Sequence, residues 1–228
     1  MKSKYQMFKS RISKEDISAM PIVSFAGEII VVDQLSKIAD CVAYLSLQSV
    51  LGVDTETRPA FSKGIHYPTS LLQISSLTRC YLIRLNKVGL PPQIANIFSN
   101  SDITKVGLAF SEDLKGLRKL TPFEPKNCID LQSIVNNYGI LDLGLQKIFA
   151  IIFGQRISKT QRLTNWDNNQ LSILQQKYAA TDAWATLCIY KTLQKSQCLP
   201  QNEVRALINA DRQLQIRHQQ EMESLSCE

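Results

Sequence analysis

The stretch Val50-Leu51-Gly52-Val53-Asp54-Thr55-Glu56-Thr57 decides how the rest of the chain is interpreted. Its first half has the aliphatic and β-branched character of a buried strand, with a glycine that permits a close neighbour. Side chains two residues apart on a strand point to the same face, so we expect Asp54 and Glu56 side by side. Two adjacent carboxylates repel unless a cation lies between them, and their oxygens suit Mg²⁺ or Mn²⁺. A polar turn after a strand is the simpler interpretation, so a metal site is supported only if the chain supplies further ligands.

The composition predicts one globular domain without a membrane span. The chain has 228 residues, of which 44% are hydrophobic and 20% charged. No segment approaches the roughly 18 apolar residues that a span requires. The basic N-terminus lacks the apolar core of a signal peptide, so we expect a cytoplasmic protein, with a nuclear location left open. Two histidines argue against a histidine-based zinc site, and the net charge of +6 is compatible with a polyanionic partner.

Hydrophobic periodicity predicts an α/β sandwich, a mixed β-sheet flanked by helices on both faces. We divide the chain into a basic arm (1–20), a folded domain (21–198) and a polar C-terminal helix or tail (199–228). The predicted strands are 21–25, 29–32, 50–57, 71–75, 80–83 and 105–108, and the predicted helices are about 34–48, 92–98, 111 onward, 129–138, 143–153 and 172–196. The predicted helix caps are Ser13, Asp33, Ser111, Ser172 with Gln175, and Gly154.

Two later acidic residues are placed to join the first pair. Asp113 lies in the first turn of a predicted helix, where an acidic residue is also favourable with the helix dipole alone. Asp182 shares a helix face with Tyr178, because residues four apart lie one above the other. The alanines around them allow that helix to pack closely on a sheet, where an unpaired acid is costly unless it binds a metal. For Tyr178 alone, a core aromatic is the simpler interpretation.

Taken in order, these residues resemble the three exonuclease motifs of the DEDD superfamily. Its tyrosine-containing branch (DEDDy), with the Werner-type exonuclease domains and ribonuclease D, is the match over about residues 20–195. Lys177 stands where the histidine branch has its histidine. The resemblance implies a ribonuclease H-like fold and a 3′-5′ exonuclease domain over 21–198. The segments that carry it are Asp54-Thr55-Glu56, Leu71-Leu72-Gln73-Ile74, Val106-Gly107-Leu108-Ala109-Phe110-Ser111-Glu112-Asp113-Leu114, Leu163-Thr164-Asn165-Trp166 and Tyr178-Ala179-Ala180-Thr181-Asp182-Ala183.

The resemblance also implies a mechanism that uses two Mg²⁺ or Mn²⁺ ions. Asp54, Glu56 and Asp182 are expected to hold the metal that activates water. Asp54 would bridge to a second metal, which Asp113 reaches directly or through water and which stabilises the leaving 3′-oxygen. Tyr178 would orient the nucleophilic water, since a tyrosine with a pKa of about 10 keeps its proton at neutral pH. The products would be nucleoside monophosphates released from the 3′ end.

Substrate contacts are predicted less specifically than the acids. The Thr55 backbone, Leu72 and Phe110 are candidates for gripping the terminal nucleotide, with core packing as the alternative. The basic loop residues Arg58, Lys159 and Arg162 are candidates for contacting phosphates, with simple surface solubility as the alternative. Trp166 is expected to be a structural residue rather than a base-stacking one.

The sequence leaves three alternatives for the partner. We favour DNA with a single-stranded or recessed 3′ end, and RNA remains an alternative through a ribonuclease D-like trimming activity. The chain offers only a fragment of the helical accessory domains that ribonuclease D would bring. A non-catalytic nucleic-acid-binding module is the third alternative, but the motifs retain all their acids. The sequence leaves the oligomeric state open.

Overall fold

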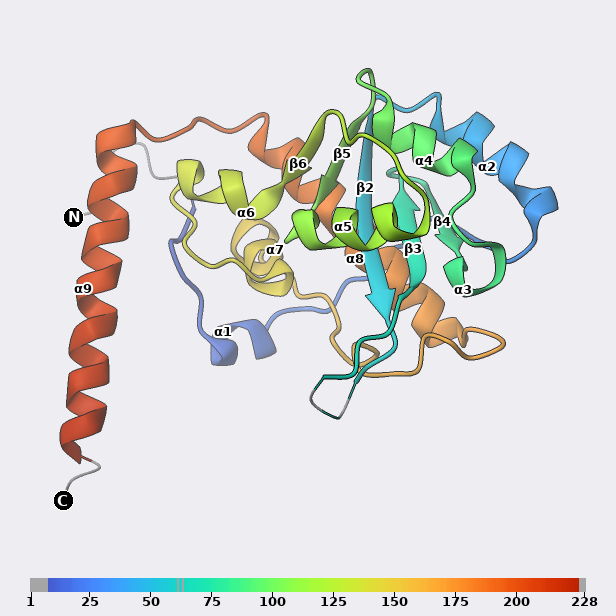
Figure 1. The fold of residues 1–228 in the computed structure, drawn as a ribbon. Coiled ribbons are helices and arrows are strands. Elements are labelled where there is room, and N and C mark those ends of the chain that lie inside the picture. Colours follow the sequence, from blue (N-terminus) through green and yellow to red (C-terminus); the bar gives the residue numbers. More distant parts are fainter. Residues whose placement is uncertain (1–7, 61, 63, 226–228) are drawn as a thin grey trace.

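The computed structural model describes residues 8–60, 62 and 64–225, and its centre is a six-stranded mixed sheet (Figure 1). The strand order is β1-β4-β3-β2-β5-β6. The pairs β2·β3 and β3·β4 are antiparallel, and the pairs β1·β4, β2·β5 and β5·β6 are parallel. The strands are β1 (Glu28–Val32), β2 (Val50–Thr57), β3 (Thr69–Ser75), β4 (Arg79–Ile83), β5 (Thr104–Gly107) and β6 (Cys128–Asp130). The strand that ends in the acidic pair is therefore central.

One face of the sheet carries the larger apolar core. Leu51 and Val53 of β2 point into this core, where they pack with side chains from the helices of this face. The helices that supply side chains to this core are α2 (Ile38–Leu45), α3 (Leu85–Val88), α4 (Pro92–Ser99) and α5 (Phe110–Leu120), and the short 3₁₀ turn η1 (Leu35–Lys37) precedes α2. Because strand residues alternate, burial of Leu51 and Val53 turns Asp54 and Glu56 to the opposite face.

The opposite face is covered by the long helix α8 (Ile173–Leu193), which crosses behind the sheet in Figure 1. Its contact with β2 is close because Gly52 faces it. A Cβ added at Gly52 would lie 2.0 Å from the Ala183 carbonyl oxygen, so a side chain there would push the helix away. The close neighbour expected at this glycine is thus α8 itself. Helix α7 (Leu145–Phe153) packs beside α8.

Two predicted elements are wrong. Residues 21–25 form no strand, because their ladder consists of a single bridge between Ile22 and Arg156. The helix predicted over 129–138 begins instead with β6, followed by α6 (Leu131–Ile134) and the 3₁₀ turn η2 (Val135–Tyr138). Parallel pairing with β5 takes these residues out of the helix.

Some of the predicted helix caps are confirmed by the structure, and others are wrong. Ser13 caps α1 (Lys14–Ser18), Ser172 and Gln175 form the capping box of α8, and Gly154 ends α7 in the left-handed conformation. Asp33 caps nothing and pairs with Lys37 at 2.8 Å. Ser111 is not a cap either, because α5 already begins at Phe110. The local capping signals therefore predicted the ends of α1, α7 and α8 correctly, but not the starts of η1 and α5.

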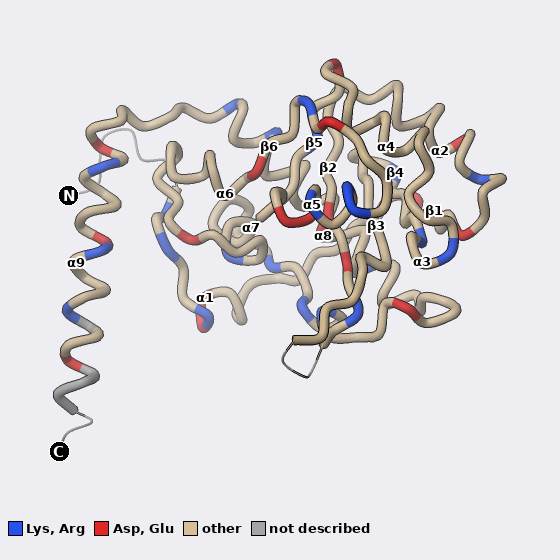
Figure 2. The backbone as a smooth tube through the Cα atoms, viewed as in Figure 1, with Lys and Arg blue, Asp and Glu red and all other residues tan. Residues whose placement is uncertain are grey.

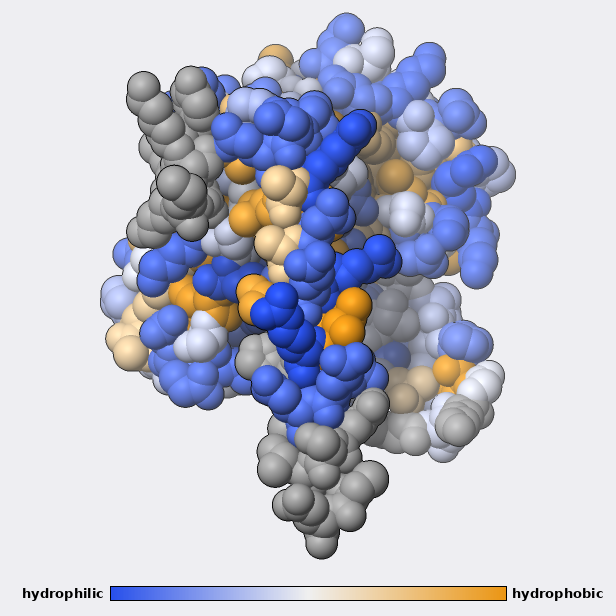
Figure 3. Space-filling view, turned by 90° about the vertical axis from the view of Figure 1, so that its left-hand side faces the viewer, coloured by the Kyte–Doolittle hydropathy of each residue, from blue (hydrophilic) through white to orange (hydrophobic). Residues whose placement is uncertain are grey.

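Helix α9 (Gln201–Leu225) forms most of the polar C-terminal segment and stands at one side of the molecule (Figure 1). Figure 3 faces this side and shows a mainly hydrophilic surface interrupted by apolar residues. Ile208, Leu214 and Ile216 are exposed apolar residues of α9. No helix within the described ranges has the length and apolar character needed to cross a membrane.

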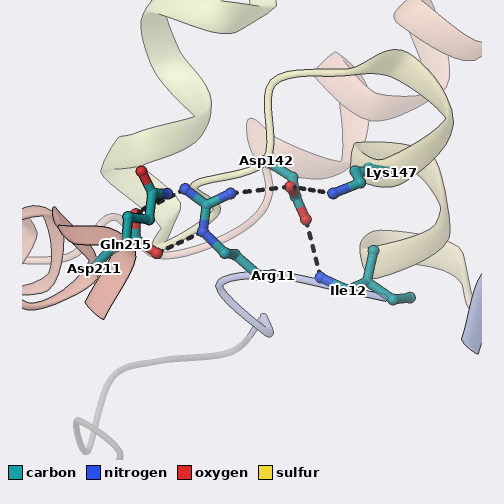
Figure 4. A network of polar contacts seen from close by, with 6 residues as sticks. All are labelled: Arg11, Ile12, Asp142, Lys147, Asp211 and Gln215. Carbon is teal, nitrogen blue, oxygen red and sulfur yellow. Dashed lines mark hydrogen bonds and ion pairs between the residues drawn. The ribbon is translucent and has the colours of Figure 1, made fainter. Parts of the chain in front are cut away.

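A polar network ties the N-terminal arm to α9 (Figure 4). Arg11 Nη2 donates to Asp211 Oδ2 at 2.7 Å, and its Nη1 donates to Asp142 Oδ1 at 3.2 Å. Asp142 is almost fully buried and also accepts from Lys147 Nζ at 2.8 Å and from the Ile12 backbone N–H at 2.9 Å. The arm is therefore anchored to two separate parts of the fold.

Candidate active site

Three of the predicted acids meet where the end of β2 faces α8. Oxygen atoms of Asp54, Glu56 and Asp182 all lie within 4.8 Å of one another. The pleat of β2 places the first two on one face, and α8 brings the third from the opposite side. Asp182 is only 8% exposed, and the other two are half-buried. An all-oxygen donor set this close fits a hard divalent cation such as Mg²⁺ or Mn²⁺.

Asp113 lies in the first turn of α5, outside that group of three. The Thr55 hydroxyl donates a hydrogen bond of 2.6 Å to Asp113 Oδ1. Thr55 comes between the two acids of β2, so it couples the fourth acid to the strand that carries them. The side chain of Thr55 thus has a defined partner that the sequence did not indicate.

The start of α5 is fixed by Asp130 at the end of β6. Its carboxylate accepts hydrogen bonds from the backbone N–H groups of Ala109 at 3.0 Å and Phe110 at 2.8 Å. Ala109 has φ 53°, in the left-handed region that costs a non-glycine residue energy. Asp130 therefore holds the strained turn at Ala109, four residues before Asp113. Sequence reasoning missed this role because it placed Asp130 inside a helix, although an aspartate before Leu131 is itself a capping signal.

Tyr178 lies next to Asp182 on α8, as the four-residue spacing predicts. Its ring packs on Trp166, with ring centroids 6.1 Å apart. Trp166 has no exposed surface, which matches a structural tryptophan and leaves no face for a base to stack on. Tyr178 therefore packs against Trp166 and lines the same pocket as Asp54, Glu56 and Asp182.

The carboxylates line a cleft of about 290 Å³. Lys159 and Arg162, from the loop before α8, line the same cleft, and Figure 2 shows basic positions in the loops near the end of β2. The start of α7, at residues 144–146, also lines this cleft, and no motif in the sequence indicates it. Acidic side chains (Asp54, Glu56 and Asp182) and two basic ones (Lys159 and Arg162) thus line the same cleft.

Three of the predicted substrate contacts lie away from this cleft. Leu72 and Phe110 are 0% and 1% exposed and belong to the core on the other face of the sheet. This burial is what the core-packing alternative predicts for Leu72 and Phe110. Arg58 lies over the Tyr67 ring, 4.8 Å from its centroid, and lines a separate hollow with Leu163.

Burial and mutual repulsion make the carboxyl groups hard to ionise without a cation. Burial is the main cause at each, and it raises the pKa of Glu56 to about 9, of Asp182 to about 7 and of Asp113 to about 6. The pKa of Asp54 is also raised well above its usual range, by burial and then by Asp182 and Glu56. The Tyr178 hydroxyl and Lys159 oppose the shift at Asp182. A site that resists negative charge in this way favours a bound cation.

We expect the metal-free protein to lose stability as the pH rises from about 4 to about 9. Each of these pKa values is raised in the folded state, so the folded protein retains protons that the unfolded chain has released, and stability falls with pH across this window. The melting temperature in EDTA should fall by about 5–10 °C beyond the general trend. Differential scanning calorimetry measures it, and Mg²⁺ should restore it at the alkaline end.

The control for this prediction is Glu56→Gln, which removes a carboxyl group whose pKa is raised to about 9. Its melting temperature should depend less steeply on pH than that of the wild type. An equal slope in the two proteins would assign the pH dependence to groups outside the cleft.

Residues 29–197 match a family model described as 3′-5′ exonuclease. The chain belongs to the 3′-5′ exonuclease family. This is a family of hydrolases that act on phosphodiester bonds and generally use divalent metal ions, which agrees with the carboxylate cluster. The family assignment predicted from the three motifs and the ribonuclease H-like α/β fold are both confirmed.

Relatives of this exonuclease domain occur in much longer proteins. The bifunctional 3′-5′ exonuclease/ATP-dependent helicase WRN of Mus musculus is 26% identical over 219 residues, which are 92% of this chain and 16% of the mouse protein. The chain spans less than two thirds of the length of its first curated relatives.

Solved structures share its fold. The Nibbler EXO domain of Aedes aegypti has a TM-score of 0.70 at 22% identity, over 81% of this chain and 99% of that chain. Escherichia coli RNase D has a TM-score of 0.65 at 22% identity, over 84% of this chain and 51% of that chain.

Proposed function

We propose that this chain is a metal-dependent 3′-5′ exonuclease that releases nucleoside monophosphates from the 3′ end of a nucleic acid. The observation that carries the proposal is the meeting of Asp54, Glu56 and Asp182 within 4.8 Å in a cleft. Asp113 on the adjacent helix and Tyr178 complete the set of catalytic residues. The exonuclease domain would extend over residues 21–198, with the arm and α9 at its side.

The acids would hold two Mg²⁺ or Mn²⁺ ions, one on Asp54, Glu56 and Asp182 and a second on Asp54 and Asp113. Such a pair supplies charge stabilisation to the attacking and leaving oxygens of an in-line displacement. In the proposed reaction, a water oxygen forms a bond to the phosphorus of the terminal nucleotide while the bond from that phosphorus to the 3′-oxygen of the preceding nucleotide breaks. The water gives up a proton to solvent, and the leaving 3′-oxygen takes up a proton. The Thr55 hydroxyl and Asp130 keep Asp113 in place during this step.

Tyr178 would position the attacking water rather than deprotonate it. Burial and the neighbouring Asp182 raise the pKa of its hydroxyl above the usual value, so it keeps its proton at neutral pH and acts as a hydrogen-bond donor. Lys159 and Arg162 face the carboxylates and would contact substrate phosphates, and both can reach a ligand because they are exposed. The Thr55 backbone would contact the terminal nucleotide, and Arg58 would contact substrate phosphates outside this cleft.

DNA with a single-stranded or recessed 3′ end is the proposed substrate, because mouse WRN, a longer relative, combines its exonuclease with a helicase. RNA trimming is the second candidate. It is favoured by the structural likeness to E. coli RNase D, which is described as an exoribonuclease involved in structured RNA processing.

A degradation assay tests the proposal. Oligonucleotides labelled at the 5′ end, as single-stranded DNA, recessed duplex and RNA, are incubated with Mg²⁺, Mn²⁺ or EDTA. The expected result is a ladder of products shortened from the 3′ end, strongest on DNA and abolished by EDTA. A ladder on RNA alone favours the trimming enzyme. Binding without cleavage under every condition supports a non-catalytic binding module and refutes the exonuclease.

A further inference from the structure

Gln73 in β3 is a buried amide with no partner among the described residues. Its side chain has no exposed surface, and neither Nε2 nor Oε1 makes a hydrogen bond. Buried polar side chains are nearly always paired, and an unpaired one destabilises the fold. The position must therefore have a use that outweighs this cost, or an apolar residue would serve the core better.

The sheet register places Gln73 directly beside Asp54. The two residues are opposite each other in the antiparallel pair of β2 and β3, so their side chains share a face with Cβ atoms about 5 Å apart. On its other side, Gln73 is opposite Leu82 of β4, which offers no polar group.

The part of α8 that packs on Leu71 is apolar as well. Leu71, two residues before Gln73 on the same face of β3, packs with Ala179 and Ala180 of α8. Alanine methyl groups cannot pair with an amide. Of the two residues directly opposite Gln73 in the neighbouring strands, Asp54 and Leu82, Asp54 is therefore the polar one.

We propose that Gln73 is a positioning residue for Asp54, whose amide Nε2 donates a hydrogen bond to the Asp54 carboxylate when that carboxylate binds a divalent ion. The inference rests on the proposed function, because it requires the acids to bind such an ion. A hydrogen bond from a neutral donor to an ionised acceptor is stronger than one between neutral groups. Partners of this kind orient metal ligands, and losing one typically costs 10–100-fold in metal affinity.

The test is Gln73→Met, which replaces the amide by an apolar side chain of similar length. Isothermal titration with Mn²⁺ should show affinity weakened by about 10-fold or more. The melting temperature of the metal-free protein should be unchanged or higher, because an unpaired buried amide has been removed. A purely structural glutamine predicts the reverse pattern, a lower melting temperature with Mn²⁺ affinity unchanged, and that result overturns the proposal.

The matched control is Ser70→Ala on the same strand. Ser70 is also buried with an unpaired hydroxyl, but it lies at the register shift and is not opposite Asp54. Its removal should leave Mn²⁺ affinity as in the wild type. Equal weakening in Ser70→Ala and Gln73→Met would trace the loss to general disturbance of β3 and overturn the assigned role.

A measurement on the wild type completes the test without relying on a variant that folds. The side-chain amide resonance of Gln73 in a ¹⁵N spectrum should shift as Mg²⁺ is added, and an unchanged resonance overturns the proposal. Wild-type protein that binds neither Mn²⁺ nor Mg²⁺ would instead refute the metal site itself. That outcome is distinct from normal metal binding with an unaffected Gln73.

Discussion

Asp54→Asn is expected to abolish exonuclease activity and to make the metal-free protein more stable. Asparagine has nearly the same shape but no charge, and Asp54 is the acid proposed to serve both metal ions. Losing charge stabilisation worth several kcal/mol corresponds to a fall of about 10³-fold or more in kcat. Removing one of several buried like charges relieves their repulsion, so the melting temperature in EDTA should rise.

Three measurements check this expectation: kcat on a labelled oligonucleotide, Mn²⁺ affinity by titration calorimetry, and melting in EDTA. Asp40→Asn is the control, because Asp40 is an exposed acid on α2, on the opposite face of the sheet. It should match the wild type in all three. Hydrolysis at a normal rate by Asp54→Asn would refute the site, and a lower melting temperature would show that its charge stabilises the fold.

Tyr178→Phe is expected to lower kcat by about 10²-fold while metal and substrate binding stay nearly constant. The substitution removes only the hydroxyl, and the ring can still pack on Trp166. A water that is no longer oriented attacks less often, and a small misplacement at a reacting centre costs about this much. Separate determination of kcat, KM and Mn²⁺ affinity checks the prediction.

The control for Tyr178→Phe is Tyr190→Phe on the same helix. The Tyr190 hydroxyl accepts a hydrogen bond from Gln194 at 3.0 Å, outside the cleft. Its loss should leave kcat unchanged. Undiminished turnover in Tyr178→Phe removes the positioning role, and a matching loss of Mn²⁺ affinity would make the hydroxyl part of the metal site instead.

Local rules were sufficient for the residues that share one element. The pleat of β2 paired Asp54 with Glu56, and the helical repeat paired Tyr178 with Asp182, because both spacings follow from backbone geometry alone. The order of the acids along the chain then indicated that these pairs belong to one site, and their oxygens do meet.

Those local rules could not predict contacts between segments that are distant in the sequence. Cys128-Ile129-Asp130 is too short to show a strand period, and it becomes β6 only because β5 is available to pair with it. The apolar segment 21–25 has no strand beside it and so remains irregular. The bond from Thr55 to Asp113 spans 58 positions, and the cleft wall at the start of α7 carries no motif.

The double attachment of Arg11 has a practical consequence for handling the protein. Asp142 comes two residues before Gly144, which lines the cleft, so the same ion-pair network touches the arm, α9 and the approach to the active site. Trimming the arm past Arg11 would leave Asp142 with Lys147 as its remaining ion-pair partner among the described residues.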